Sequence, residues 1–142
     1  MNRIKKIFQT RSKKVIPFLT SGYPRKQDTL SLVLAAESGG AAMVELGMPF
    51  SDPLADGPVI QTSSQKAIEN GVNLSWILET VLEIRKQSEI TIILMGYINP
   101  IIKYGLNVFI LDCKNSGVDG LIIPDLPPEE AEEFVIKSKE NT

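Results

Sequence analysis

Short apolar runs and longer amphipathic segments alternate along this chain. Four runs rich in β-branched residues predict strands over residues 14–20, 42–46, 91–95 and 119–123. Apolar positions spaced three to four residues apart predict helices over 28–37, around 63–70, over 74–87, near 108–115 and from Glu129 onward, with a short helical turn after 97–100. Residues 47–61 lack such a period and predict a long loop. Strands and helices therefore alternate.

The predicted strands are almost continuously apolar, which is typical of strands covered on both faces in a parallel sheet of βα units. A weak internal repeat supports this arrangement, because residues 38–44 resemble residues 116–122 at an offset of 78 positions, or two units. Gly39 and Gly40 mark the end of the first long helix. An N-terminal helix and four βα units then account for residues 1–142 as one domain.

Two architectures of the α/β class fit four such units: an open doubly wound sheet, or the first half of a (β/α)8 TIM barrel. No Gly-x-Gly-x-x-Gly follows the first strand and no P-loop is present, so the usual nucleotide-binding motifs are missing. A complete barrel needs about 250 residues, or roughly 200 at the least. The chain has 142 residues, so a barrel fold would make it a half barrel.

Composition narrows the chemistry. The chain is 43% hydrophobic and 23% charged, as in globular proteins, and its net charge of -2 argues against nucleic acid as a partner. It has no histidine, which excludes Ser-His-Asp and Cys-His nucleophiles and every His-ligated metal site. The single cysteine, Cys113, excludes an intramolecular disulfide and a Cys-cluster metal site, and fits a reducing cytoplasm. Acid–base chemistry must then come from Asp, Glu, Lys or Tyr.

The amino terminus allows two interpretations. No run of about 20 apolar residues is present, so we expect no membrane span. Residues 1–14 carry six basic side chains and no acidic one, which fits an organelle-targeting segment. The same residues fit an amphipathic helix that lies over the underside of the fold, with Ile4, Ile7 and Phe8 on its apolar face. The helix is favoured because the first strand follows at once.

Glu45 interrupts an apolar strand near its carboxyl end, where parallel α/β folds place their active sites. Its apolar neighbours should partly desolvate the carboxylate, an environment that disfavours the charged form and suits a general acid. Two structural explanations stay open beside this one: an ion pair with a nearby Lys or Arg, or a carboxylate that reaches solvent at the strand end.

The loop after this strand is rich in residues that restrict the backbone. Residues 47–58 contain prolines and glycines together with Asp52 and Asp56. If the loop folds back, Glu45 and Asp56 could share one small substrate and divide acid and base roles. Local capping of backbone N–H groups, as in an Asx turn, is the alternative; we expect it for Asp52 and leave it open for Asp56.

More side chains follow the strands at the same rim. Tyr97 and Asn99 lie just past the third strand and Asp125 just past the fourth, where each alone is typical of a turn or capping residue. Apolar residues occupy equivalent strand-end positions: Phe18, Met95 and Ile122. These fit plain core packing, and together they would also line a pocket suited to an aromatic ring.

One contiguous segment resembles a known family. Residues 45–58 read ELGMPFSDPLADGP, which closely resembles the signature of tryptophan synthase alpha chains. Three further segments match in order: PFLTSGYP at 17–24, LMGYINP at 94–100 and DGLIIPDLP at 119–127. The resemblance covers the whole chain, but only the amino-terminal half of the family's barrel.

The resemblance implies a lyase of tryptophan biosynthesis, which splits indole-3-glycerol phosphate into indole and glyceraldehyde 3-phosphate by retro-aldol cleavage. Glu45 matches the family's acid–base carboxylate, which protonates C3 of the indole and assists release of the aldehyde. Asp56 matches the carboxylate that holds the indole N–H and stabilises the positive charge developing on the ring. Four further residues match positions around the indole: Phe18, Met95, Tyr97 and Ile122.

The family works as an αββα complex that passes indole to a beta chain. By resemblance, the loop that includes Asp52, Pro53 and Pro58 lies on the beta-facing surface. Pyridoxal phosphate belongs to that beta chain, so we expect no cofactor and no metal in this chain.

The substrate phosphate in such barrels is held by loops after the last strands, which the matched half does not contain. We therefore expect the chain to be an amino-terminal fragment of a cytoplasmic enzyme, without detectable turnover alone. A non-catalytic half-barrel module that docks on a beta-type partner is the main alternative. A different sugar-phosphate barrel enzyme, such as an isomerase, is disfavoured by the contiguous match over residues 45–58.

Overall fold

Four parallel strands form one sheet in the order in which they occur along the chain. The structure is a computed structural model that describes residues 3–140, without the side chains of Glu133, Lys139 and Glu140. The strands are β1 (Phe18–Thr20), β2 (Met43–Gly47), β3 (Thr91–Met95) and β4 (Gly120–Ile122). The helices are α1 (Arg3–Ile7), α2 (Asp28–Ser38), α3 (Pro58–Glu69), α4 (Leu74–Arg85), α5 (Ile98–Tyr104), α6 (Leu106–Ser116) and α7 (Glu132–Glu140).

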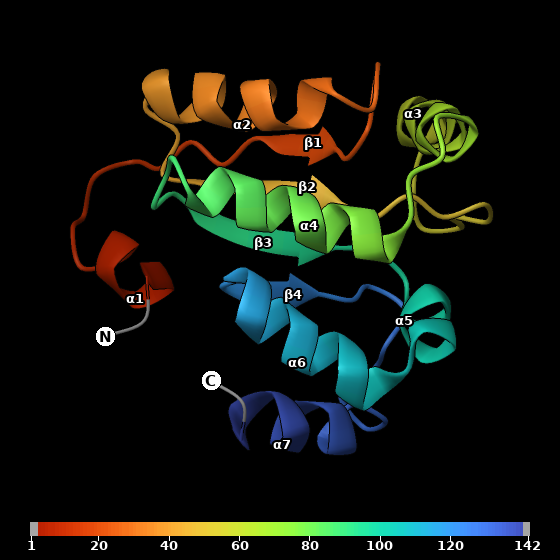
Figure 1. Cartoon of the computed structure of the whole chain (residues 1–142). Coiled ribbons are helices and arrows are strands. Elements are labelled where there is room, and N and C mark those ends of the chain that lie inside the picture. The colour runs from red at the N-terminus through yellow and green to blue at the C-terminus, as the bar shows by residue number, and fades with distance from the viewer. Residues whose placement is uncertain (1–2, 141–142) are drawn as a thin grey trace.

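The strand order decides between the two architectures. In a doubly wound sheet the order reverses at a switch point and helices cover both faces, whereas a barrel is wound in one direction with its helices outside. Here the order is β1-β2-β3-β4, and α2, α4 and α6 lie next to one another along one side of the sheet (Figure 1). The chain is therefore wound like the first half of a (β/α)8 barrel.

The hydrophobic core lies between the sheet and these helices. Alternate strand residues, Val44 and Leu46 on β2 and Ile92 and Leu94 on β3, are 0% exposed. They pack with core residues of α2, α4 and α6: Val33, Ile77, Val81, Ile84 and Phe109. Because side chains alternate along a strand, the residues between them point to the opposite face, here called the inner face.

The first strand is shorter than predicted. Residues 14–20 are expected to be extended, but β1 contains only Phe18–Thr20. The carbonyls of Val15 and Pro17 still accept hydrogen bonds, from Ala42 N–H just before β2 at 2.9 Å and from Glu45 N–H of β2 at 3.0 Å. Pro17 has no N–H with which to donate in return, so the ladder begins only at Phe18.

Two helices begin at other positions than predicted. α3 starts at Pro58 and not near residue 63, because Gly57 and Pro58 occupy the N-cap and first positions, for which proline is well suited. α7 starts at Glu132 and not at Glu129, because residues 127–131 form turns in which Glu130 N–H donates to Pro127 O at 3.0 Å. The long loop after β2 is correspondingly shorter and ends at Gly57.

Both segments of the internal repeat contain a helix end closed in the same way. Gly40 after α2 and Gly117 after α6 both have positive φ, +88° and +87°, although the repeat itself pairs Gly117 with Gly39. In each case the next residue donates back to the last turn of the helix, Ala41 N–H to Ala36 O at 3.0 Å and Val118 N–H to Cys113 O at 2.9 Å. This closure turns the chain from a helix into the next strand in both units, one residue later after α2 than the repeat implies.

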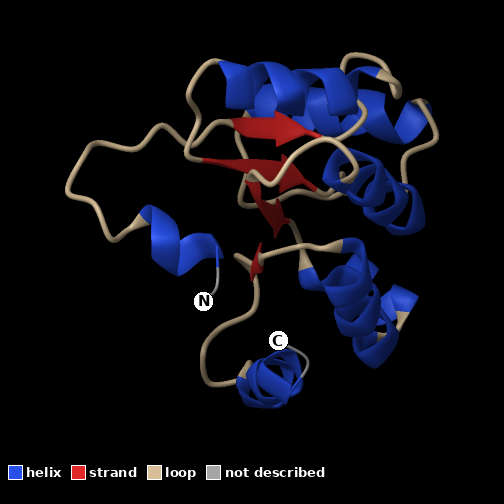
Figure 2. Cartoon of the chain, turned by 60° about the vertical axis from the view of Figure 1, so that its left-hand side comes forward, coloured by secondary structure: helices blue, strands red, loops and turns tan. Residues whose placement is uncertain are grey.

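A helix is present near the amino terminus, at the amino ends of the strands and away from the arrowheads (Figures 1 and 2). Arg3 binds Glu89 and also Asp119, at 3.1 Å from Nη1 to Oδ1. Ile4 and Ile7 are half-buried, but Phe8, expected on the same apolar face, is 59% exposed because α1 ends at Ile7. Within residues 3–140, no helix is long and apolar enough to cross a membrane.

Asp119 joins α1 to the sheet and to α4. Its carboxylate accepts hydrogen bonds from Ile92 N–H at 2.9 Å and from the Arg85 guanidinium at 2.8 Å, besides that of Arg3. The side chains of Asp119 and Arg85 are only 7% and 11% exposed. Burial lowers the pKa of Arg85, and Asp119 opposes that shift by stabilising the guanidinium charge.

Candidate functional site

Strand register places Glu45 on the inner face. Phe18 of β1 and Ile93 of β3 are paired with Glu45 across the sheet, so their side chains point the same way. This direction is opposite to that of Val44 and Leu46, which enter the core. Glu45 is therefore presented on the concave side of the half barrel.

The Glu45 carboxylate has no partner in the described part of the chain. The side chain is half-buried, between the buried residues Val44 and Leu46. None of the salt bridges or side-chain hydrogen bonds among residues 3–140 involves it. An ion pair with Lys or Arg, one of the two structural explanations above, is therefore not formed, and the carboxylate is free to bind a ligand or exchange a proton.

A small pocket lies at the carboxyl ends of the strands. Its volume is about 20 Å³. Four of the site residues expected from the sequence line it: Phe18, Asp56, Met95 and Tyr97. The Phe18 ring lies directly over Gly47, where an added Cβ would be 2.5 Å from its Cζ atom. Only glycine at position 47 leaves room for this ring at the pocket wall.

Tyr97 connects the loop after β2 to the loop after β3. Its hydroxyl donates to Asp56 Oδ2 at 3.1 Å and accepts from Ala55 N–H at 2.9 Å. Its ring lies 5.4 Å from that of Phe50, centre to centre. The side chain is buried, and burial raises the pKa of Tyr97; the bond to Asp56 raises it further and the Ala55 N–H opposes the shift. The loop therefore does fold back, and it carries Asp56 into the pocket.

The other two expected site residues lie beside the pocket and do not line it. Glu45 is paired with Phe18, and Ile122, which is 38% exposed, is paired with Met95. Both thus share the inner face with a pocket residue on a neighbouring strand. Strand pairing thus places these two residues next to the pocket, on the inner face of the sheet.

The capping expectations have mixed outcomes. The expected Asx turn of Asp52 is wrong: its carboxylate accepts no hydrogen bond within residues 3–140, and backbone bonds close the turns, from Leu54 N–H to Asp52 O and from Asp56 N–H to Pro53 O, both 3.0 Å. Asp125 does cap, because its Oδ1 accepts Ile98 N–H at 3.0 Å at the start of α5. Asn99 is exposed on α5.

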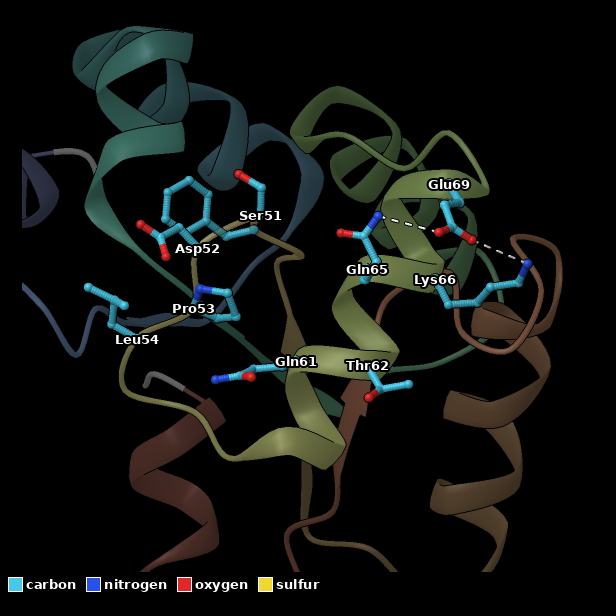
Figure 3. A pocket seen from close by; sticks show the side chains of 10 residues that line it. Ser51, Asp52, Pro53, Leu54, Gln61, Thr62, Gln65, Lys66 and Glu69 are labelled. Carbon is cyan, nitrogen blue, oxygen red and sulfur yellow. Dashed lines mark hydrogen bonds and ion pairs between the residues drawn. The ribbon is translucent and has the colours of Figure 1, made fainter.

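A larger groove lies on the outer side of the same loop, between the loop and α3 (Figure 3). Its volume is about 540 Å³, and it is lined by Phe50, Ser51, Asp52, Pro53, Leu54, Gln61, Thr62, Gln65, Lys66 and Glu69. Leu54 is 83% exposed there, Asp52 is exposed and Pro53 is buried. Pro58 is exposed at the start of α3 and does not line the groove.

Sequence reasoning missed Ser64. This residue of α3 is 5% exposed, lines the small pocket and makes no hydrogen bond through its side chain within the described residues. The available signal is a small polar residue on the buried side of a helix, but a helix predicted only around residues 63–70 is too short to show which side is buried. No cluster of three or more His, Cys, Asp or Glu side chains among residues 3–140 could hold a metal ion.

Comparisons with known proteins agree on one family. A family model described as tryptophan synthase alpha chain matches residues 4–142. The alpha chain of Petrotoga mobilis is 47% identical over 141 residues, 99% of this chain and 54% of that protein. The alpha chain of Clostridium acetobutylicum is 49% identical over 130 residues, 92% of this chain and 49% of that protein.

Solved structures give the same result. Tryptophan synthase subunit alpha from Legionella pneumophila superposes with a TM-score of 0.97 at 40% identity, over 99% of this chain and 56% of that one. A chain of the tryptophan synthase complex from Pyrococcus furiosus superposes with a TM-score of 0.86 at 44% identity, over 90% and 52%. The chain spans about half the length of the relatives it matches, and its four βα units correspond to the first half of their TIM barrel.

Proposed function

The chain belongs to the tryptophan synthase alpha chain family, and on that basis we propose that it supplies the amino-terminal half of a lyase site for indole-3-glycerol phosphate. One observation carries the proposal beyond family membership. The folded loop brings the Asp56 carboxylate into one pocket with Phe18, Met95 and Tyr97, while the unpartnered Glu45 lies on the adjoining inner face.

This arrangement suits an indole ring. Phe18 and Met95 offer flat and flexible apolar contacts, with Ile122 at the open edge. Only one oxygen of Asp56 is used by Tyr97, so Oδ1 remains available to accept the indole N–H. The pocket is too small for a whole ring as it stands, so we propose that it forms the nitrogen-binding end of a larger site that continues over the inner face.

The proposed reaction needs one acid–base group and one fixed negative charge. Glu45 donates a proton to C3 of the indole, and the resulting positive charge on the ring nitrogen is stabilised by Asp56. Glu45, now a carboxylate, takes the proton of the hydroxyl on the side-chain carbon that is bonded to C3. The bond between that carbon and C3 then breaks, its electron pair returns to the ring, and the products are indole and glyceraldehyde 3-phosphate.

The substrate phosphate is proposed to bind outside these four units. In (β/α)8 barrels, phosphate sites are frequent in the loops after strands 7 and 8, and the relatives extend about as far again as the part matched here. The lack of turnover by residues 1–142 alone stays a prediction.

The groove beside α3 is proposed to bind a beta chain. Two similar structures are described as a tryptophan synthase complex and an a2b2 complex from Pyrococcus furiosus. Leu54 and Asp52 present an exposed apolar and an exposed acidic contact there, while Pro53 and Pro58 shape the loop and its junction with α3. Pyridoxal phosphate is proposed to stay with that partner.

A chimera tests the lyase proposal. This chain replaces the 141-residue matched part of the Petrotoga mobilis alpha chain, and indole release from indole-3-glycerol phosphate is measured. We expect Asp56→Asn to lower kcat by about 100-fold, the loss typical of one charge-stabilising group. Asp112→Asn is the matched control, because Asp112 also accepts a tyrosine hydroxyl, that of Tyr104, but lies on α6 away from the pocket. Equal activity of the two variants would contradict the proposal.

A further inference from the structure

We propose that Tyr97 is a positioning residue for Asp56, fixing which carboxylate oxygen faces the ligand, and not only a wall of the indole pocket. The inference rests on the proposed function, because it concerns the same pocket. It deepens that function by giving the Tyr97 hydroxyl a role that needs no contact with the substrate.

The position of Asp56 explains why it needs such a partner. Asp56 is the last loop residue before the N-cap of α3, and Gly57 and Pro58 follow it. Its carboxylate has no ion pair within residues 3–140, and its side chain has Tyr97 as its hydrogen-bond donor. Without that donor the carboxylate could rotate about its side-chain bonds, and a ligand N–H would have to fix it at an entropic cost.

Tyr97 is itself held in place at three points. Its backbone lies two residues after the end of β3 and forms the N-cap of α5, its ring packs against Phe50, and its hydroxyl oxygen accepts Ala55 N–H at 2.9 Å. That backbone donor occupies one side of the oxygen and leaves the O–H proton directed at Asp56 Oδ2, 3.1 Å away. The result is a chain of two hydrogen bonds that runs from a backbone amide through a buried phenol to the carboxylate.

The consequence for binding is geometric. Because Oδ2 is occupied by the phenol, a ligand N–H that enters the pocket meets Oδ1 in a fixed orientation. The hydroxyl stays a donor at neutral pH, since burial and the nearby carboxylate both disfavour its ionisation. Removing the hydroxyl while keeping the ring should therefore leave the apolar pocket intact and weaken only recognition of the N–H.

The test compares two ligands on this chain. Indole and 1-methylindole have similar rings, but only indole carries an N–H, so their affinity ratio, measured by NMR titration, reports the Asp56 contact. We expect wild type to favour indole by about ten-fold, as for one hydrogen bond to a charged group. Tyr97→Phe should remove most of this preference, as Asp56→Asn should, while changing 1-methylindole affinity less than two-fold.

Tyr104→Phe is the matched control. Tyr104 also donates to an aspartate, Asp112 at 2.7 Å, outside the pocket, so its loss should leave the indole preference unchanged. If wild type shows no preference for indole, the proposed function and this inference both fail. If wild type shows it and Tyr97→Phe keeps it, the inference alone is overturned.

A second measurement does not depend on ligand binding. Tyrosinate absorbance is titrated in wild type and in Asp56→Asn, with Tyr97→Phe used to identify the Tyr97 signal. Loss of the Asp56 charge should lower the pKa of Tyr97 and leave Tyr104 unmoved. An unchanged Tyr97 titration would show that the two side chains are not coupled and would overturn the inference even if a variant binds ligand poorly.

Discussion

At the scale of single residues, Cys113 and Tyr97 are equally buried, each 6% exposed, yet their surroundings differ. Tyr97 has a carboxylate and a backbone amide at its oxygen. Cys113 lies on α6 in the hydrophobic core, and burial raises the pKa of its thiol to about 12, with the charge of Asp112 adding to the shift. The first environment orients a functional group, and the second keeps a thiol protonated and unreactive.

The Cys113 thiol should make stability fall at high pH. The unfolded thiol ionises near pH 9.0 and the folded one only near 12, so the stabilising contribution is complete below pH 9 and is lost as pH rises. We expect the free energy of unfolding to decrease above pH 9 by up to about 1.4 kcal/mol per pH unit. Urea unfolding at pH 8, 9 and 10, compared with Cys113→Ala, measures this slope. If Cys113→Ala shows the same slope, the loss of stability at high pH comes from other ionisable groups.

The role of a side chain could be predicted only where the residues around it in space are also its neighbours in the sequence. The placement of Glu45 on a strand was enough to expect a carboxylate at the strand end. Asp52 and Asp56 lie in one loop with similar surroundings in sequence, and only the fold-back that brings Tyr97 to Asp56 separates them. That contact joins residues 41 positions apart, which no local pattern contains.

At the scale of elements, β1, α3 and α7 show where local patterns mislead. Apolar periodicity predicts that all three exist but not where they begin. The starts of β1 and α3 depend on Pro17 and Pro58, which have no backbone N–H, and the start of α7 depends on turns over residues 127–131 that use backbone N–H groups outside the helix. The attachment of α1 depends on Asp119 instead, a charged residue at the start of β4. Its partners Arg3 and Arg85 come from distant parts of the chain, and Arg3 also binds Glu89.

The side chains bound to Asp119, Arg3 and Arg85, should contribute very unequally to the free energy of unfolding. Asp119→Asn leaves the guanidinium of Arg85, 11% exposed, without its buried counter-charge, and we expect a loss of about 3 kcal/mol in the free energy of unfolding. Arg3→Met removes a partner that is 36% exposed and should cost about 1 kcal/mol or less. Urea unfolding followed by fluorescence of Trp76, the single tryptophan, gives both values. Equal losses would contradict this account of the cluster.

At the scale of the whole molecule, the sequential strand order separates the half barrel from a doubly wound sheet. The sequence contained the number of units but not their direction of winding, which depends on which face of the sheet each helix covers. The same fold gives the loop after β2 two sides: Asp56 lines the inner pocket, and the exposed Leu54 lies at the outer groove.

The outer groove should determine affinity for a beta chain. Leu54→Asp places a charge where an exposed leucine would become buried, and we expect about ten-fold or greater weakening of binding by the chimera, measured by calorimetry. Leu82→Asp is the control, since Leu82 is an exposed leucine of α4 outside the groove, 44% exposed. Weakening by both variants alike would mean that the groove is not the contact.

The most direct test of the central claim is the turnover of indole-3-glycerol phosphate by the chimera with Glu45→Gln. Glutamine keeps the size of the side chain but can neither donate nor take up the proton. The account predicts indole release by the unaltered chimera and a fall in kcat of about 100- to 10,000-fold in the variant, with Glu37→Gln on α2 unchanged. Turnover by Glu45→Gln at the unaltered rate would show that this carboxylate is not the acid–base group.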